Sequence, residues 1–275
     1  MTLADAYAHC ESVARAEDRD RWLASLFAPA VARPALHALI AFEREMTRLR
    51  EAVREPQAGE IRLVWWREAL TGPRRDEAQA NPVAAAMIDT LERLRPPPHL
   101  IENAIAGRQF DLYDDPFATV ADLEAYLGET RSGLLQIAAF ALGEASGAAE
   151  ASGLAGVAIG LTELLRGLSR PRPLNFAPRE TLARHGAAIE DFRARRVTPA
   201  LAGALGELAA LARRRLGEAE TARLRLPNAL SPAYAGLATA PLWLTAVERA
   251  RYFEAPLALA AWRRQWTLWR WMRRG

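Results

Sequence analysis

The segment that decides the fold reads Ala41-Phe42-Glu43-Arg44-Glu45-Met46-Thr47-Arg48-Leu49-Arg50-Glu51. Apolar residues recur here every three or four positions, as on a helix with one buried face. These residues are Leu39, Phe42, Met46, Leu49 and Val53. Off this stripe, Glu43, Thr47 and Glu51 lie four residues apart and therefore follow one line along the helix. The segment predicts an amphipathic helix with a line of polar side chains.

The rest of the chain has the same helical character. Its 275 residues are 51% hydrophobic, Ala, Leu, Arg and Glu dominate, and no run alternates with the period of a strand. Breaks rich in Pro and Gly separate predicted helices. These helices cover 3–16, 19–28, 32–54, 59–71, 81–94, 98–114, 119–143, 148–168, 179–184, 188–194, 198–222, 230–251 and 255–273. We predict one all-α domain over residues 1–255 and a C-terminal amphipathic helix within 256–275.

Composition excludes several functional classes. The net charge is only +3, and both signs are interspersed before the C-terminus, which argues against a nucleic-acid partner. A single cysteine, Cys10, excludes an internal disulfide, and the four histidines lack zinc-ligand spacing. The chain starts as a helix rather than a signal peptide, so we expect a cytoplasmic, reducing compartment. Serine-hydrolase, phosphate-loop and dinucleotide motifs do not occur in the sequence.

Residues 132–168 form the most apolar part of the chain and are rich in Gly and Ala. Helices that are apolar nearly all round are usually central in a bundle. Because no strand precedes Gly156 and Gly160, we interpret these glycines as positions of close helix packing rather than as a phosphate loop.

Several ordered motifs resemble the squalene/phytoene synthase family over roughly residues 5–250. The matching segments are 41–44 for Ala-Phe-Cys-Arg, 110–112 for Met-Asp-Leu, 126–133 for Tyr-Cys-Tyr-x-Val-Ala-Gly, 156–166 for Gly-x-Ala-x-Gln-Leu-x-Asn-Ile-Leu-Arg, and 174–178 for the Tyr-Leu-Pro step. The resemblance implies an isoprenoid-synthase-type helical bundle around a central cavity. It also implies head-to-head condensation of prenyl diphosphates by Mg²⁺ held between two aspartate pairs.

Those aspartate pairs are degraded in this chain. The first pair falls on Thr47 and Glu51, the second on Gly167 and Pro171, and the amide position before the second pair is Glu163. One acid out of four is a poor ligand set for several magnesium ions. We therefore expect no conventional catalysis, and a magnesium cofactor only if the chain is active.

Other family positions persist and define a candidate cavity. The resemblance places Arg44 and Arg166 toward a diphosphate, although pairing with Glu51, Glu129 or Glu163 inside the bundle is the favoured interpretation. The candidate ligand-binding residues are Arg44, Thr47, Glu51, Asp111, Tyr126, Glu129, Glu163 and Arg166.

Asp111, Asp114 and Asp115 form a new acidic group. A predicted helix through residue 114 would place Asp111 and Asp115 on one face. One interpretation is a rebuilt Mg²⁺ site with the ligands Glu51, Asp111, Asp114 and Asp115. The favoured alternative is a solvated helix end at which Asp111 keeps a structural hydrogen bond.

The pattern Phe-x-x-Glu-x-x-x-x-Arg-Glu from Phe42, followed by Gly59 to Leu70 with its Trp65-Trp66 pair, resembles a non-catalytic branch of the family. That branch includes a mitochondrial respiratory complex I assembly factor. The resemblance implies an isoprenoid-binding or assembly-type protein at the inner face of a membrane. Its expected partners are a prenyl lipid, prenyl diphosphate or quinone, and a respiratory complex subunit. The alternative is an active head-to-head prenyltransferase with the rebuilt Mg²⁺ site.

The C-terminal segment 261–275 combines tryptophan with arginine. Trp262, Trp266 and Trp269 share a helical face, and Arg263 and Arg270 lie around it. This mixture is typical of a helix in the headgroup layer of an anionic membrane. An equally weighted alternative is that the tryptophans pack on the bundle while the arginines are solvated.

Overall fold

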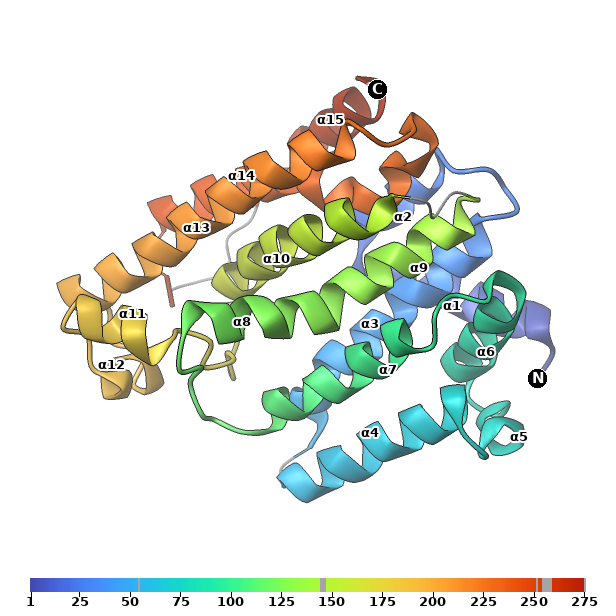
Figure 1. The fold of residues 1–275 in the computed structure, drawn as a ribbon, viewed down its shortest axis with the longest axis horizontal. Coiled ribbons are helices and arrows are strands. Elements are labelled where there is room, and N and C mark those ends of the chain that lie inside the picture. Colours follow the sequence, from blue (N-terminus) through green and yellow to red (C-terminus); the bar gives the residue numbers. More distant parts are fainter. Residues whose placement is uncertain (54, 144–146, 251, 254–258, 275) are drawn as a thin grey trace.

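Every element in the part of the chain that the structure describes is a helix, which confirms the all-α class. The computed structural model describes residues 1–53, 55–143, 147–250, 252–253 and 259–274 (Figure 1). The α-helices are α1 (Leu3–Glu17), α2 (Arg19–Ser25), α3 (Arg33–Ala52), α4 (Pro56–Thr71), α5 (Arg75–Ala78), α6 (Pro82–Leu94), α7 (His99–Ala106), α8 (Val120–Leu127), α9 (Gly133–Ala141), α10 (Ala148–Gly167), α11 (Arg179–Arg184), α12 (Ile189–Arg193), α13 (Pro199–Arg223), α14 (Ala235–Arg249) and α15 (Ala261–Met272). Two 3₁₀ segments, η1 (Gly107–Leu112) and η3 (Asn228–Tyr234), and one π-helix, η2 (Gly128–Ser132), complete the set.

The predicted amphipathic helix is α3. Its apolar stripe is buried as expected, with Phe42, Met46 and Leu49 each at most 5% exposed. Phe42 packs edge-on against Trp66 of α4, with ring centroids 5.3 Å apart. Glu43 is buried with the stripe, so one acid of the polar line points into the bundle.

Helix α10 lies in the middle of the bundle, between α13 and α14 on one side and α9 with η2 on the other (Figure 1). A Cβ atom on Gly156 would lie 2.8 Å from the backbone nitrogen of Ser132, and one on Gly160 would lie 2.5 Å from Cδ2 of Leu127. Neither position has room for a side chain. The prediction that these two glycines serve close packing is confirmed.

Two predicted helices end or change earlier than expected. The helix predicted over 98–114 consists of α7 and then η1, which ends at Leu112. The helix predicted over 119–143 is interrupted by η2, because five residues there adopt the wider π-helical turn. Short α5 was not predicted.

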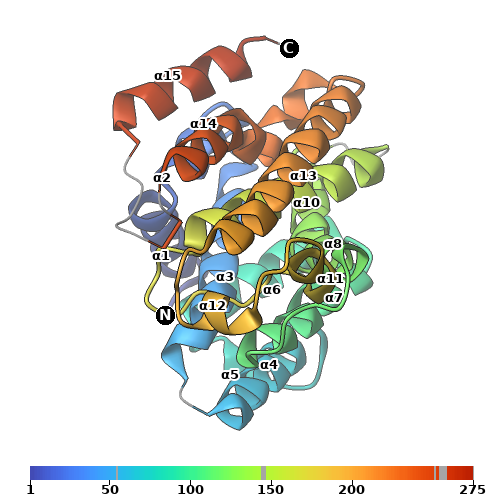
Figure 2. The same cartoon turned by 90° about the vertical axis from the view of Figure 1, so that its left-hand side faces the viewer.

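Helix α15 lies on the outside of the bundle, against α14 and α2 (Figure 2). The predicted domain boundary at residues 255/256 and the start of the predicted 255–273 helix fall outside the described residues. Among the described helices, α10 has the length and apolar composition of a membrane span, and 56% of its most apolar window is buried within the bundle.

Candidate functional site

A cavity of about 150 Å³, here called the main cavity, lies between helices from both halves of the chain. Helices α2, α3, α9, α10, α14 and α15 all contribute to its wall. One part of the wall is apolar and includes Leu36, Leu39, Leu134, Ile159 and Trp243. The other part carries acids and arginines. A cavity of this kind suits a ligand with an apolar chain and a polar head.

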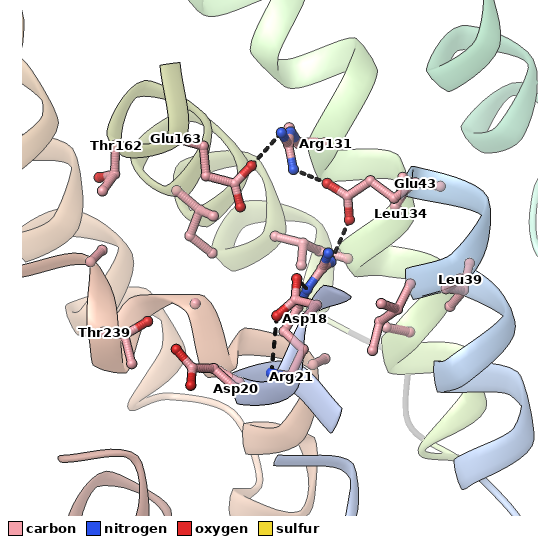
Figure 3. Close-up of a pocket in the computed structure, with 18 of the residues that line it drawn as sticks. Asp18, Asp20, Arg21, Leu39, Glu43, Arg131, Leu134, Thr162, Glu163 and Thr239 are labelled. Carbon is pink, nitrogen blue, oxygen red and sulfur yellow. Dashed lines mark hydrogen bonds and ion pairs between the residues drawn. The ribbon is translucent and has the colours of Figure 1, made fainter. Parts of the chain in front are cut away.

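One guanidinium group joins the two sides of the charged part. Arg131 of η2 forms ion pairs with Glu43 of α3 through Nη1 and with Glu163 of α10 through Nη2 (Figure 3). The side chain of Glu43 is only 3% exposed. Two carboxylates that share one guanidinium group would repel each other in its absence, and the guanidinium between them neutralises that repulsion. Arg131 therefore ties α3 to α10 across the cavity.

The ion pairs continue from Glu43 to α2. Arg21 pairs with Glu43, and its Nε lies 2.7 Å from Oδ2 of Asp18. Nη2 of Arg44 lies 3.7 Å from the same oxygen of Asp18. Acids and arginines alternate along this path. The residues that we call the cavity charge network are Asp18, Arg21, Glu43, Arg44, Arg131 and Glu163.

The network keeps the carboxylates of Asp18 and Glu163 ionised. Burial raises the pKa of Glu163, but nearby arginines outweigh burial and lower that pKa to about 2. Burial also raises the pKa of Asp18, and the charges of Arg21 and Arg44 again reverse the effect, so its pKa lies below the usual value. Both carboxylates are negatively charged at neutral pH.

Local sequence explains how these side chains reach one place. Asp18 caps the N-terminus of α2 by accepting a hydrogen bond from the backbone nitrogen of Arg21, 3.2 Å away. Glu43 lies on the buried face of α3. Arg131 lies in the π-helical turn η2, which packs directly on α10 because Gly156 has no side chain. Such turns are frequent at functional sites.

A second cavity of about 80 Å³ adjoins the first and shares Arg44, Arg131 and Glu163 with it. Six of the eight predicted cavity residues line it, namely Arg44, Thr47, Glu51, Asp111, Tyr126 and Glu163. Of the remaining two, Arg166 lines the main cavity. Glu129 is exposed and lines neither of these two cavities.

Asp111 is held by two neighbours in the second cavity. Tyr126 donates its hydroxyl hydrogen to Oδ1 of Asp111 at 2.5 Å, and Nη1 of Arg108 donates to Oδ2 at 3.2 Å. Burial, with the charge of Asp111, raises the pKa of Tyr126 well above its usual value, so the phenol stays a donor. These contacts agree with a structural role for Asp111.

The other acids near Asp111 do not share its helical face. Because η1 ends at Leu112, Asp114 and Asp115 lie beyond the helix, and both are exposed. Asp114 forms an ion pair with Arg50 of α3. The premise of a continuous helix through residue 114 was wrong, because the last turn tightens to 3₁₀ geometry and stops before Asp114.

The two arginines predicted to face a diphosphate have different neighbours. Arg44 pairs with Asp18, which was not among the predicted partners. The guanidinium of Arg166 lies over the ring of Trp243, 3.8 Å from its centroid, as in a cation–π interaction. Glu163 attracts Arg166 electrostatically and forms its ion pair with Arg131.

The described residues do not fit a magnesium cluster. Mg²⁺ requires several converging oxygen ligands, yet the carboxylates of Glu43 and Glu163 are bound by Arg131, and that of Asp111 by Tyr126 and Arg108. Glu51 is exposed. Within the described part of the chain, no group of three His, Cys, Asp or Glu side chains converges on one point.

Sequence reasoning missed four members of the charge network as site residues: Asp18, Arg21, Glu43 and Arg131. A signal existed for two of them. Glu43 begins the polar line of α3, and Arg131 lies within the segment 126–133 that carries the family resemblance. The Asp18–Arg21 pair gave no motif, because its partners Glu43 and Arg44 lie on the next helix and not at a short, fixed spacing.

The fold and cavity define a class of protein, the all-α bundles built like isoprenoid synthases. The chain shares this fold with a dehydrosqualene synthase solved in complex with a ligand (TM-score 0.80, 19% identity, 98% of this chain and 95% of that one). It also shares the fold with squalene synthase HpnC from Alicyclobacillus acidocaldarius (TM-score 0.72, 19% identity, 92% of this chain and 97% of that one).

Sequence comparison gives the family. Residues 14–270 match squalene/phytoene synthase, and the chain belongs to that family. Among its relatives is the Rattus norvegicus protein named NADH dehydrogenase (ubiquinone) complex I, assembly factor 6, which is 26% identical over 248 residues, covering 89% of this chain and 74% of the relative. The Homo sapiens protein of the same name is 26% identical over 229 residues, covering 82% and 69%.

Proposed function

We propose that this chain is a non-catalytic family member that binds a prenyl-type amphiphile and assists assembly of a respiratory complex at a membrane surface. Relatives named as complex I assembly factors support the assembly role. The apolar wall and charged end of the main cavity support a ligand such as a prenyl lipid or quinone.

The observation that carries the proposal is the position of Arg131. Ionisation of a prenyl diphosphate requires concentrated positive charge that is free to meet the leaving group. Here a cation between α3 and α10 is part of the protein itself, and Glu43 and Glu163 already bind it. The network stabilises the bundle, whereas a catalytic site would need unpaired charge at the diphosphate.

Catalysis is tested by measuring diphosphate release from farnesyl and geranylgeranyl diphosphate, with Mg²⁺ and with a chelator, followed by lipid extraction. We expect no release above a protein-free control and no condensed hydrocarbon. Magnesium-dependent release with a condensed product would instead identify an active prenyltransferase. Circular dichroism of the same sample ensures that the protein assayed is folded.

The assembly role is tested in cells that lack the gene. We expect less assembled respiratory complex I on native gels, with recovery when the wild-type chain is supplied. Unchanged complex I levels would contradict the assembly role. Extraction of the purified protein with organic solvent, followed by mass spectrometry, tests for a co-purifying prenyl lipid or quinone.

A further inference from the structure

Helix α15 has one face fixed to the bundle. Leu268, Trp271 and Met272 are buried, each at most 8% exposed. Nε1 of Trp271 donates a hydrogen bond to Glu220 of α13 at 2.6 Å, and the guanidinium of Arg223 lies 4.7 Å from the Trp271 ring centroid. The orientation of α15 about its own axis is therefore set by specific contacts.

The opposite face carries three large aromatic side chains that remain in contact with solvent. Trp262 is 70% exposed, Trp266 54% and Trp269 39%. The rings of Trp266 and Trp269 stack with centroids 5.0 Å apart. We call these three residues the tryptophan face. Exposed apolar groups gathered on one helix mark interaction sites, because water is a poor solvent for them.

The charged residues of α15 itself all have one sign. Residues 259–274 include Arg263, Arg270 and Arg273 and contain no acid. Arg273 lies over the ring of Trp269, 4.7 Å from its centroid. Indole rings beside arginines match the headgroup layer of an anionic bilayer, where the rings enter the interface and the guanidinium groups meet lipid phosphates.

A second group of exposed apolar side chains follows α2. Helix α15 packs on α2, and the connection that follows α2 exposes Leu26, Phe27 and Val31, the last at 78%. Helix α4, with its own exposed Ile61 and Val64, lies at the other end of the molecule (Figure 2).

The fixed side of α15 also reaches the main cavity. Arg264 lines that cavity, and its Nη1 lies 2.7 Å from Oδ2 of Asp20 in α2. The same guanidinium lies 5.7 Å from the ring centroid of Trp243, another cavity residue. A surface bound by the tryptophan face would therefore be one helix away from the cavity.

We propose that the tryptophan face docks α15 flat on an anionic lipid bilayer, with the α15 side of the main cavity turned toward the lipid. In this orientation the cavity exchanges its amphiphile with the bilayer. That exchange rests on the proposed function, whereas docking itself requires no ligand and no assembly partner. The two ideas therefore fail independently.

Docking is tested by co-sedimentation of the full chain with vesicles of phosphatidylcholine alone or mixed with phosphatidylglycerol. We expect binding to the mixed vesicles, and roughly tenfold weaker binding after Trp262→Gln with Trp266→Gln, because each replacement removes interfacial apolar area. The matched control is Ile61→Gln with Val64→Gln on α4, which we expect to bind like wild type. Equal binding of both double variants, or equal binding to neutral vesicles, would overturn the proposal.

Fluorescence quenching tests whether the tryptophan face meets the lipid, and sedimentation tests whether it binds a second copy of the chain instead. Brominated lipids should quench part of the tryptophan fluorescence in wild type and less after Trp262→Phe with Trp266→Phe. Equal quenching would contradict docking through this face. Sedimentation velocity without lipid should give the same mass for wild type and variant; a dimer that depends on Trp262 and Trp266 would assign the face to a second copy of the chain.

Discussion

The charged end of the main cavity and the tryptophan face of α15 are both rich in arginine, but they use it differently. In the cavity, arginines alternate with carboxylates, as in the contacts of Arg131 with Glu43 and Glu163. On α15 the helix supplies arginines and tryptophans and no acid. Paired arginines hold helices together, whereas arginines without acids on their own helix are suited to an external anion.

This difference bears on our proposal that the chain keeps the family fold without the family chemistry. A buried cation between α3 and α10 is needed wherever carboxylates from both helices face each other. In this chain Arg131 supplies a cation between the two helices, and we propose that it takes the place of a metal ion there.

The largest effect is expected for Arg131→Met. Removal of the guanidinium leaves Glu43 and Glu163 near each other without a shared partner, and breaking a buried pair of this kind costs about 3 kcal/mol or more. Chemical denaturation measures the loss. The matched control Arg263→Met on α15 should change the free energy of unfolding by less than about 0.5 kcal/mol. Similar losses of unfolding free energy in the two variants would show that Arg131 contributes no more to stability than an arginine on the surface of α15.

A smaller loss is expected for Gly156→Ala, which introduces a Cβ atom against the backbone of Ser132 in η2. Overpacking of this kind costs about 1–3 kcal/mol. Gly153→Ala, three residues earlier on α10, meets no atom within 4 Å and should be neutral or stabilising because alanine favours helices. If both variants were equally stable, η2 would not depend on close contact with α10.

Tyr126→Phe should lower the free energy of unfolding by about 1 kcal/mol or slightly more. The substitution removes the hydrogen bond to buried Asp111 and leaves one carboxylate oxygen without its donor. Tyr113→Phe removes an exposed hydrogen bond to Glu60 and should have a smaller effect. An equal loss of unfolding free energy in the two variants would show that the hydrogen bond of Tyr126 to Asp111 stabilises the protein no more than an exposed one.

The last effect is expected in the dependence of stability on pH rather than in stability at neutral pH. The folded-state pKa of Glu163 is about 2, below its ordinary value of 4.5, so its contribution is full above pH 4.5 and is lost as pH falls toward 2. Asp20 opposes this trend, since burial raises its pKa despite Arg264. Glu163→Gln should reduce the slope of the unfolding free energy against pH at acidic pH, as measured by chemical denaturation at a series of pH values. An unchanged slope would contradict the lowered pKa.

Much of the fold could be predicted because helical periodicity is local. The stripe of α3 and the small residues of α10 fixed which faces are buried, and the family motifs located Asp111 and Tyr126, which do meet in one cavity. The end of η1 at Leu112 could not be predicted, because helix ends depend on weak local preferences. The acidic site considered for Asp111, Asp114 and Asp115 relied on a helix that continued through residue 114.

The charge network could not be predicted for a different reason. Its contacts join α2 and α3 to η2 and α10, which come from a distant part of the sequence. Arg131 reaches its partners from a π-helical turn, and periodicity alone predicts an α-helix there. Similarly, the sequence placed Trp262, Trp266 and Trp269 on one face but left open which face of α15 packs inward. The structure buries Leu268, Trp271 and Met272 and leaves that face exposed.

The central claim is that an internal arginine, and no bound magnesium, joins α3 to α10. Thermal unfolding of the wild-type protein in a chelator and in a millimolar excess of Mg²⁺ tests this most directly, since any ligand that binds only the folded state raises the unfolding temperature. We predict the same unfolding temperature in both conditions. A saturable rise with Mg²⁺ concentration would show that the folded protein holds the metal and would contradict the account.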